Sequence, residues 1–250
     1  MKGEMKDGVR LPSREDSLPK RFYKSAGVLK TDDGWAVQLD GRSIRTPMKS
    51  ALAVPTEALA ILMADEWAAQ GERIDPATMP LTRLAHGAID ATSANRDAVL
   101  AEITKYAGTD LLRHRAEESI LVRRQAEAWD DHLRWAKDEL GAHLTTIVGV
   151  MPTSTPPEAL EALHTRAATY DDWQLTALMQ ATALTTSAVL GFALVENRAT
   201  AAEIFAASRV DEDYQIEQWG EDAEAQKRAE FQKTECLAIG AMLGALQPPQ

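Results

Sequence analysis

The segment from residue 174 to residue 195 constrains the fold most, because it contains no charged side chain. Its length would allow a helix to cross a bilayer. However, seven of its side chains are Gln, Ser or Thr, and its apolar side chains recur at steps of three and four, which is typical of a helix enclosed by other helices. We therefore predict one helix over residues 172–196 at the centre of an all-helical domain. A membrane-spanning helix is the alternative.

Helical spacing of apolar side chains extends over most of the chain after residue 90. Thr92 or Ser93 is suited to cap the first of these helices. Thr200 and Glu203 have the spacing of a capping box, in which each side chain satisfies a free backbone amide at the start of a helix. Besides the central segment, we expect helices over residues 93–107, 119–140, 158–169, 201–219 and 221–245.

Residues 22–47 show a different pattern, because apolar and polar side chains alternate there at a period of two, most clearly over residues 35–39. Asp40 and Gly41 are suited to the positive φ angles of a tight hairpin. We expect three short antiparallel strands, covered by a helix over residues 55–70. The predicted fold class is α+β, with a small N-terminal β-meander and a larger all-helical, orthogonal bundle-like domain.

From these patterns we predict a disordered tail over residues 1–20, an N-terminal α/β domain over residues 21–90 and a C-terminal helical domain over residues 91–250. The first twenty residues mix acidic and basic side chains without an apolar run, unlike a secretory signal or an acid-poor mitochondrial transit sequence. We therefore expect a cytoplasmic bacterial protein, or a protein of the mitochondrial matrix if the source is a eukaryote.

Charge and cysteine content exclude several classes of function. The net charge of −11 disfavours nucleic acids and anionic membranes, which are bound mainly through Lys and Arg. Residues 1–50 have a charge balance of +4, so the other residues carry −15. The single cysteine, Cys236, cannot form an internal disulfide and lies in a helical pattern, where we expect a buried structural thiol.

The stretch from residue 66 to residue 82 ends in a segment that cannot be a regular helix, because Pro76 and Pro80 each lack a backbone donor. Its large apolar side chains favour a packed loop over a mobile one. Those side chains are Trp67, Met79 and Leu81.

An enzyme is the main alternative class of function. Asp110 with His114, or Asp130 with His132, could act as an acid and base pair. Charged helix surfaces explain the same residues more simply, and the sequence has no phosphate-binding glycine loop, dinucleotide fingerprint or nucleophile elbow. We therefore expect no cofactor, no metal and no catalysis.

By composition alone, the acids of the acidic and aromatic run over residues 208–220 are better explained as a solvated helix face, with Tyr214 and Trp219 filling core space. This run is one of two groups of residues that match a known family. The other group is Arg21, Phe22, Tyr23, Lys24, Leu39, Asp40, Gly41, Arg42, Thr46, Pro47, Glu66, Trp67, Gln70, Asp75, Pro76, Met79, Pro80, Leu81 and Thr82. Both groups resemble motifs of a family of ATP synthase assembly chaperones that bind the α subunit of the catalytic sector.

The resemblance implies a protein, monomeric when free, that binds the unassembled α subunit, shields its β-facing surface and releases it during assembly. Two groups of residues are expected to bind this partner. The first is the acidic run with Asp211, Glu212, Asp213 and Glu217, of which Glu212 is the leading candidate. The second is the proline-containing loop with Trp67, Asp75, Met79 and Leu81. We expect Met79→Asp to reduce binding more than stability.

Overall fold

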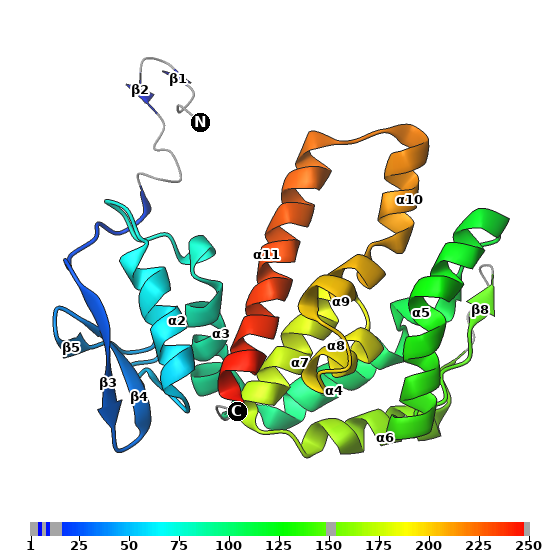
Figure 1. The fold of residues 1–250 in the computed structure, drawn as a ribbon, viewed down its shortest axis with the longest axis horizontal. Helices are drawn as coiled ribbons and strands as arrows, with labels where there is room; N and C mark the ends of the chain where they lie inside the picture. Colours follow the sequence, from blue (N-terminus) through cyan, green and yellow to red (C-terminus); the bar gives the residue numbers. More distant parts are fainter. Residues whose placement is uncertain (1–4, 7–8, 11–16, 149–153, 248–250) are drawn as a thin grey trace. The chain divides into compact units, whose positions relative to one another are not determined.

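In the computed structural model, residues 5–6, 9–10, 17–148 and 154–247 are described (Figure 1). The chain forms two compact units, Met1–His86 and Gly87–Gln250. Our expected boundary lay a few residues later, after residue 90. Most of the expected tail lies outside the described residues. Its last part does not fit a disordered tail, because Lys20 pairs with Arg73 in an antiparallel bridge.

The first unit contains a small antiparallel sheet, as predicted. β3 pairs with β4 along its whole length, and β5 and β6 both pair with β4. Asp40 and Gly41 take φ angles of 48° and 76°, so the expected hairpin geometry is present. The Asp40 carboxylate accepts hydrogen bonds from the backbone amides of Lys24 and Ser25. The strands are β3 (Ala26–Thr31), β4 (Gly34–Leu39), β5 (Arg42–Ser43) and β6 (Ala53–Val54), and β1 (Met5–Lys6) pairs separately with β2 (Val9–Arg10).

Helix α2 (Glu57–Ala68) packs on this sheet, as the sequence predicted. The Thr56 hydroxyl accepts a hydrogen bond from the amide of Leu59 and so caps the helix. Leu59 and Met63, four residues apart, are fully buried. A short 3-10 helix, η1 (Pro76–Thr78), and helix α3 (Pro80–His86) complete the unit.

The second unit is helical, apart from a two-residue parallel pairing of β7 (His114–Arg115) with β8 (Ile147–Val148). Gly141 ends α5 with a φ of 70°, and the capping box of Thr200 and Glu203 is present at the start of α9. The unit contains η2 (Gly87–Thr92), α4 (Arg96–Gly108), η3 (Leu111–Arg113), α5 (Ser119–Leu140), α6 (Pro157–Ala168), α7 (Asp172–Thr185), α8 (Ala188–Val195), α9 (Ala201–Ser208), α10 (Val210–Trp219) and α11 (Ala223–Leu246).

Three of the predicted helix boundaries are wrong. Residues 172–196 form two helices instead of one, because Thr186 takes the left-handed conformation and Ser187 caps α8. Residues 201–219 are likewise divided at Arg209. Helix α4 begins after Asn95, without a side-chain cap from Thr92 or Ser93. These breaks depend on polar side chains inside otherwise helical patterns, which compete for backbone hydrogen bonds.

Helices α7 and α8 nevertheless form the core of this unit, as expected of an uncharged segment. Gly191 of α8 lies so close to α7 that a Cβ atom there would be 2.6 Å from the Thr182 hydroxyl oxygen. Only glycine therefore fits at this crossing. Within the described part of the chain, no helix has both the length and the apolar character needed to span a bilayer.

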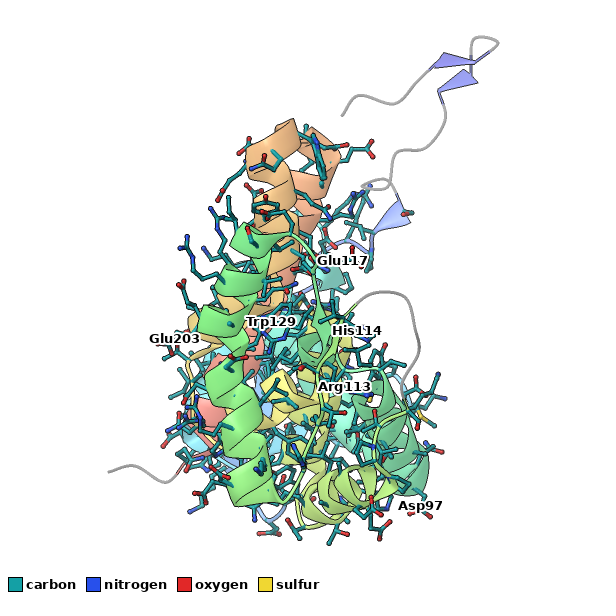
Figure 2. The ribbon with its side chains drawn as sticks, turned by 90° about the vertical axis from the view of Figure 1, so that its right-hand side faces the viewer. Asp97, Arg113, His114, Glu117, Trp129 and Glu203 are labelled. Atoms are coloured by element: carbon teal, nitrogen blue, oxygen red, sulfur yellow. The ribbon has the colours of Figure 1, made fainter. Side chains whose placement is uncertain are left out.

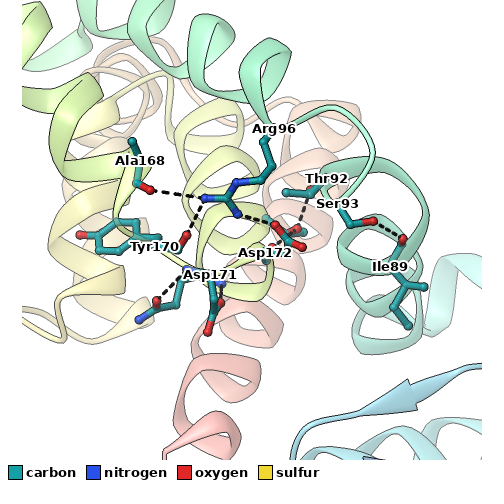
Figure 3. A network of polar contacts seen from close by, with 10 residues as sticks. Ile89, Thr92, Ser93, Arg96, Ala168, Tyr170, Asp171 and Asp172 are labelled. Carbon is teal, nitrogen blue, oxygen red and sulfur yellow. Dashed lines mark hydrogen bonds and ion pairs between the residues drawn. The ribbon is translucent and has the colours of Figure 1, made fainter. Parts of the chain in front are cut away.

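A polar network joins the start of α4 to the turn between α6 and α7 (Figure 3). Arg96 forms an ion pair with Asp172 and donates a hydrogen bond of 2.7 Å to the carbonyl oxygen of Tyr170. Nearby, the hydroxyls of Thr92 and Thr176 are hydrogen-bonded at 2.7 Å. These contacts fix the ends of helices whose apolar faces form the core.

Candidate partner-binding surface

Helix α10 carries the acidic run, and one of its faces lies against α5. The side-chain amide of Gln125 donates to the Asp211 carboxylate at 2.7 Å. Arg124 donates to the Glu217 carboxylate at 2.8 Å, and its guanidinium lies 5.4 Å from the centre of the Tyr214 ring. These contacts hold the whole of α10 in a defined orientation.

Electrostatic contacts also act on two titratable groups of this helix, Glu217 and Tyr214. The hydrogen bond from Arg124 holds the pKa of Glu217 below its usual value. Tyr214 has a raised pKa, chiefly because its hydroxyl is hydrogen-bonded to the Glu118 carboxylate. Asp213 is paired with Arg209 at 3.1 Å. The local charge is therefore negative at neutral pH.

Glu212 differs from the other three acids. Its side chain is exposed, as are those of Asp213 and Glu217, but among the described residues no side-chain hydrogen bond or ion pair involves Glu212. Because helix positions three and four apart share a face, Glu212, Ile216 and Trp219 lie together on the side of α10 turned away from α5. The Trp219 side chain is 80% exposed, so the alternative that it fills core space is wrong.

The proline-containing loop of the first unit is packed, as expected from its apolar side chains. Met79 is 2% exposed and forms a hydrophobic cluster with Tyr23, Leu39 and Ile74, against which Trp67 packs. Leu81 is also buried. The side chains of Met79 and Leu81 therefore do not reach the surface of this unit, and our expectation that Met79→Asp would affect binding more than stability is wrong.

Two polar residues, Glu66 of α2 and Gln70 just after the helix, hold this loop in place. The Glu66 carboxylate accepts hydrogen bonds from the amides of Leu81 and Thr82, at 2.7 and 2.8 Å, and so anchors the start of α3. The side chain of Gln70 accepts from the Asp75 amide at 2.8 Å and donates to the Thr78 hydroxyl. Burial raises the pKa of Glu66, and the hydrogen bonds to its carboxylate oppose this shift.

The acids of the two alternative acid and base pairs are bound by other residues. Asp110 is fully buried and bonds to Ser187 and Val189, whereas His114 is exposed. Asp130 is bound at 2.6 Å to Arg115, whose guanidinium lies 5.3 Å from the centre of the Trp129 ring. Figure 2 labels His114 and Trp129 among the side chains of this unit.

Among the described residues, no three His, Cys, Asp or Glu side chains lie together as metal ligands would.

The first half of α11 offers a surface that the sequence analysis did not predict. Residues 223–235 contain only one large apolar side chain, Phe231, and this shortage was the available signal that the segment is not packed in a core.

Comparisons with known proteins agree on one family. Residues 20–137 match the ATP12 chaperone protein family. A relative from Schizosaccharomyces pombe, described as mitochondrial protein atp12, is 24% identical over 82% of this chain and 75% of its own length. The corresponding Saccharomyces cerevisiae protein is 25% identical, over 74% of this chain and 71% of its own length.

Solved structures give a closer match. The crystal structure of Atp12 from Paracoccus denitrificans is 42% identical, has a TM-score of 0.84 and covers 92% of this chain and 99% of its own. A protein from Agrobacterium tumefaciens is 40% identical with a TM-score of 0.86, and covers 92% of this chain and 87% of its own. Sequence, fold and coverage together place this chain in the ATP12 chaperone family.

Proposed function

We propose that this protein is an assembly chaperone of ATP synthase. In this proposal it binds the unassembled α subunit of the catalytic sector, shields the surface that later contacts the β subunit, and releases it during assembly. Membership of the ATP12 chaperone family supports the chaperone part. The physical reason is that an unassembled obligate subunit exposes a large apolar interface, which a reversible partner protects from wrong contacts.

We place the binding surface on α10 because of the exposed acid Glu212. Asp211, Asp213 and Glu217 are held by neighbouring side chains, so these three acids shape and fix α10. Glu212 has no such structural contact among the described residues and lies on the same face as the exposed Trp219. An exposed aromatic ring is typical of a binding surface, and a charge on the same face can steer a partner of opposite charge.

The proposal gives the loop in the first unit a supporting role. Met79 and Leu81 hold the loop from inside, while the partly buried Trp67 and Asp75 lie nearer its surface. Asp75 accepts a hydrogen bond from the Ala77 amide at 3.0 Å, which fixes the turn into η1. Any contact of this loop with the α subunit would therefore be made by a preformed shape rather than by a mobile segment.

Charge reversal at Glu212 tests the function directly. Purified protein is mixed with freshly refolded α subunit, and separately with β subunit, and complexes are measured by size-exclusion chromatography and by titration at two salt concentrations. We expect a complex with the α subunit, and about tenfold weaker binding with Glu212→Lys. Because the side chain is exposed, the variant should unfold at the same denaturant concentration as the parent.

Glu139→Lys is the matched control, since Glu139 is an exposed acid at the other end of α5. Its affinity for the α subunit should stay within about twofold of the parent. The choice of α10 would be wrong if both variants bound equally well. Failure of the parent to bind the α subunit at all would refute the proposed function itself.

A further inference from the structure

Helix α11 is packed along only half of its length. Its buried residues are confined to the second half, from Cys236 onward. There the helix lies against α7, α8 and α9, and the Cys236 thiol donates to the Ala201 carbonyl oxygen at 3.3 Å. Over residues 223–235 no side chain is buried. Figure 1 shows this first half standing beyond the helices that support the second half.

The free half of α11 is nevertheless built as a stable helix. The Asp222 carboxylate caps it by accepting hydrogen bonds from the amides of Glu224 and Ala225. Residues 223–230 are all Ala, Glu, Gln, Lys or Arg, which are the strongest helix formers. Its continuity with the packed second half, together with these residues, favours the helix, so its surface is preorganised for a partner.

A stripe of small side chains runs along this free half. The buried residues Cys236, Ile239 and Leu243 recur at steps of three and four. Toward the start of the helix, the same face carries Gln232 and then the small side chains of Ala229 and Ala225. Alanine side chains permit close approach of another helix, at the separation of about 8 to 10 Å between axes that packed helices require.

Helix α10 lies between α5 and the first half of α11, so its face turned away from α5 is on the side of α11 (Figure 1). Helix α9 packs on the second half of α11, and α10 follows α9 directly in the chain. Gly220, with a φ of 89°, then begins the connection that returns the chain into α11 (Figure 1). Neither α10 nor residues 223–235 contain a buried side chain, so both helices present faces without a packed neighbour among the described residues.

These two helices are also the most acidic part of the chain. Residues 211–230 contain eight acidic and two basic side chains, a balance of −6 within a net charge of −11 for the whole protein. Exposed apolar groups accompany the charge, because Trp219 is 80% and Phe231 48% exposed. The surface therefore combines negative charge with apolar contact area, which complements a segment that is both basic and apolar.

We infer that α10 and the first half of α11 form a two-helix clamp that takes a basic, amphipathic helix of the partner subunit. The clamp consists of Glu212, Ile216 and Trp219 on α10 together with Ala225 and Ala229 on α11. A third helix laid between these faces completes a three-helix bundle, with its apolar side on the alanine stripe and Trp219, and its Lys and Arg side chains near the acids. This inference rests on the proposed function and adds α11 to the binding surface.

A pair of substitutions on α11 tests the clamp with the full chain. Ala229→Arg adds bulk and positive charge to the alanine stripe. Thr234→Arg adds the same group to an exposed position about five residues on, on another face of the same helix. Neither side chain is buried, so both variants should keep the stability of the parent. We expect Ala229→Arg to weaken binding to purified α subunit by about tenfold and Thr234→Arg to change it by less than about twofold.

Hydrogen exchange gives a second readout. With the α subunit bound, the amides of residues 223–235 should exchange about tenfold more slowly than in the free chain. Equal affinities of the two variants, or no protection of this segment in the complex, would overturn the clamp while leaving the proposed function intact. Protection that rises with the concentration of the free chain would assign the clamp to a second copy of this protein, which would also overturn the inference. Absence of any complex with the parent would instead refute the proposed function.

Discussion

The carboxylate of Asp110 accepts a hydrogen bond of 2.8 Å from the hydroxyl of Ser187, a residue 77 positions later in the chain. Its second oxygen accepts from the amide of Val189 at 3.0 Å. This one buried side chain therefore binds the start of α8 and, through the amide of Leu112, also the start of η3. Burial raises the pKa of Asp110, and the hydrogen bonds oppose that shift.

Removal of this carboxylate should destabilise the protein strongly. Asp110→Ala leaves three buried donors without their acceptor, so we expect the free energy of unfolding to fall by about 2 to 4 kcal/mol. Urea unfolding followed by circular dichroism measures the change. Asp138→Ala, at an exposed position of α5, is the control and should change stability by less than about 0.5 kcal/mol. A similarly small effect at Asp110 would mean that the break between α7 and α8 does not depend on it.

Substitution of two methionines of the first unit should change stability to very different extents. Met79 is 2% exposed and Met48 is 71% exposed. Met79→Ala should lower the free energy of unfolding by about 2 to 4 kcal/mol, because it leaves a cavity in the cluster with Tyr23 and Ile74. Met48→Ala should have little effect. Thermal unfolding of both variants checks this, and comparable melting temperatures would contradict the core position of Met79.

Acid sensitivity should depend in part on Glu196. Arg166 donates to both of its carboxylate oxygens, at 2.7 and 2.9 Å, and these hydrogen bonds hold the pKa of Glu196 below its usual value of 4.5. A lowered folded-state pKa gives stability that is present above the usual pKa and is lost as the pH falls through the folded value.

Glu196→Gln should therefore be less stable than the parent at pH 7, by no more than about 1 kcal/mol because the pair is partly exposed. The difference should shrink as the pH falls below about 4.5. Denaturant unfolding at neutral and acidic pH measures it, with Glu139→Gln as the control. A difference between parent and variant that stayed constant with pH would show that the ion pair is not its source.

Local sequence patterns were sufficient for the regular elements. The alternation over residues 35–39, the Asp40–Gly41 turn and the capping box before α9 were all predicted, and all are present. Each depends on residues only a few positions apart, because backbone conformation, capping and hairpin geometry are short-range effects.

The burial of individual apolar residues could not be predicted from local patterns. Met79 and Trp219 both follow helical or turn patterns and both are large, yet one is buried and the other almost fully exposed. Likewise, α11 is one continuous helix, but its buried residues are confined to the second half, from Cys236 onward. Burial depends on whether a distant segment covers the residue, and no local pattern contains that information.

By itself, then, the sequence determined the α+β class, most of the helices and the acidic character of residues 211–230. Only the tertiary structure decided that the uncharged segment is two helices joined at Thr186, since Asp110, far away in the chain, binds the start of the second. It also decided which of the four neighbouring acids have partners: Asp211 and Glu217 are bound by side chains of α5 and Asp213 by Arg209, whereas Glu212 has no such contact among the described residues. Contacts between segments far apart in sequence form only when the chain folds, and they select among the alternatives that local chemistry allows.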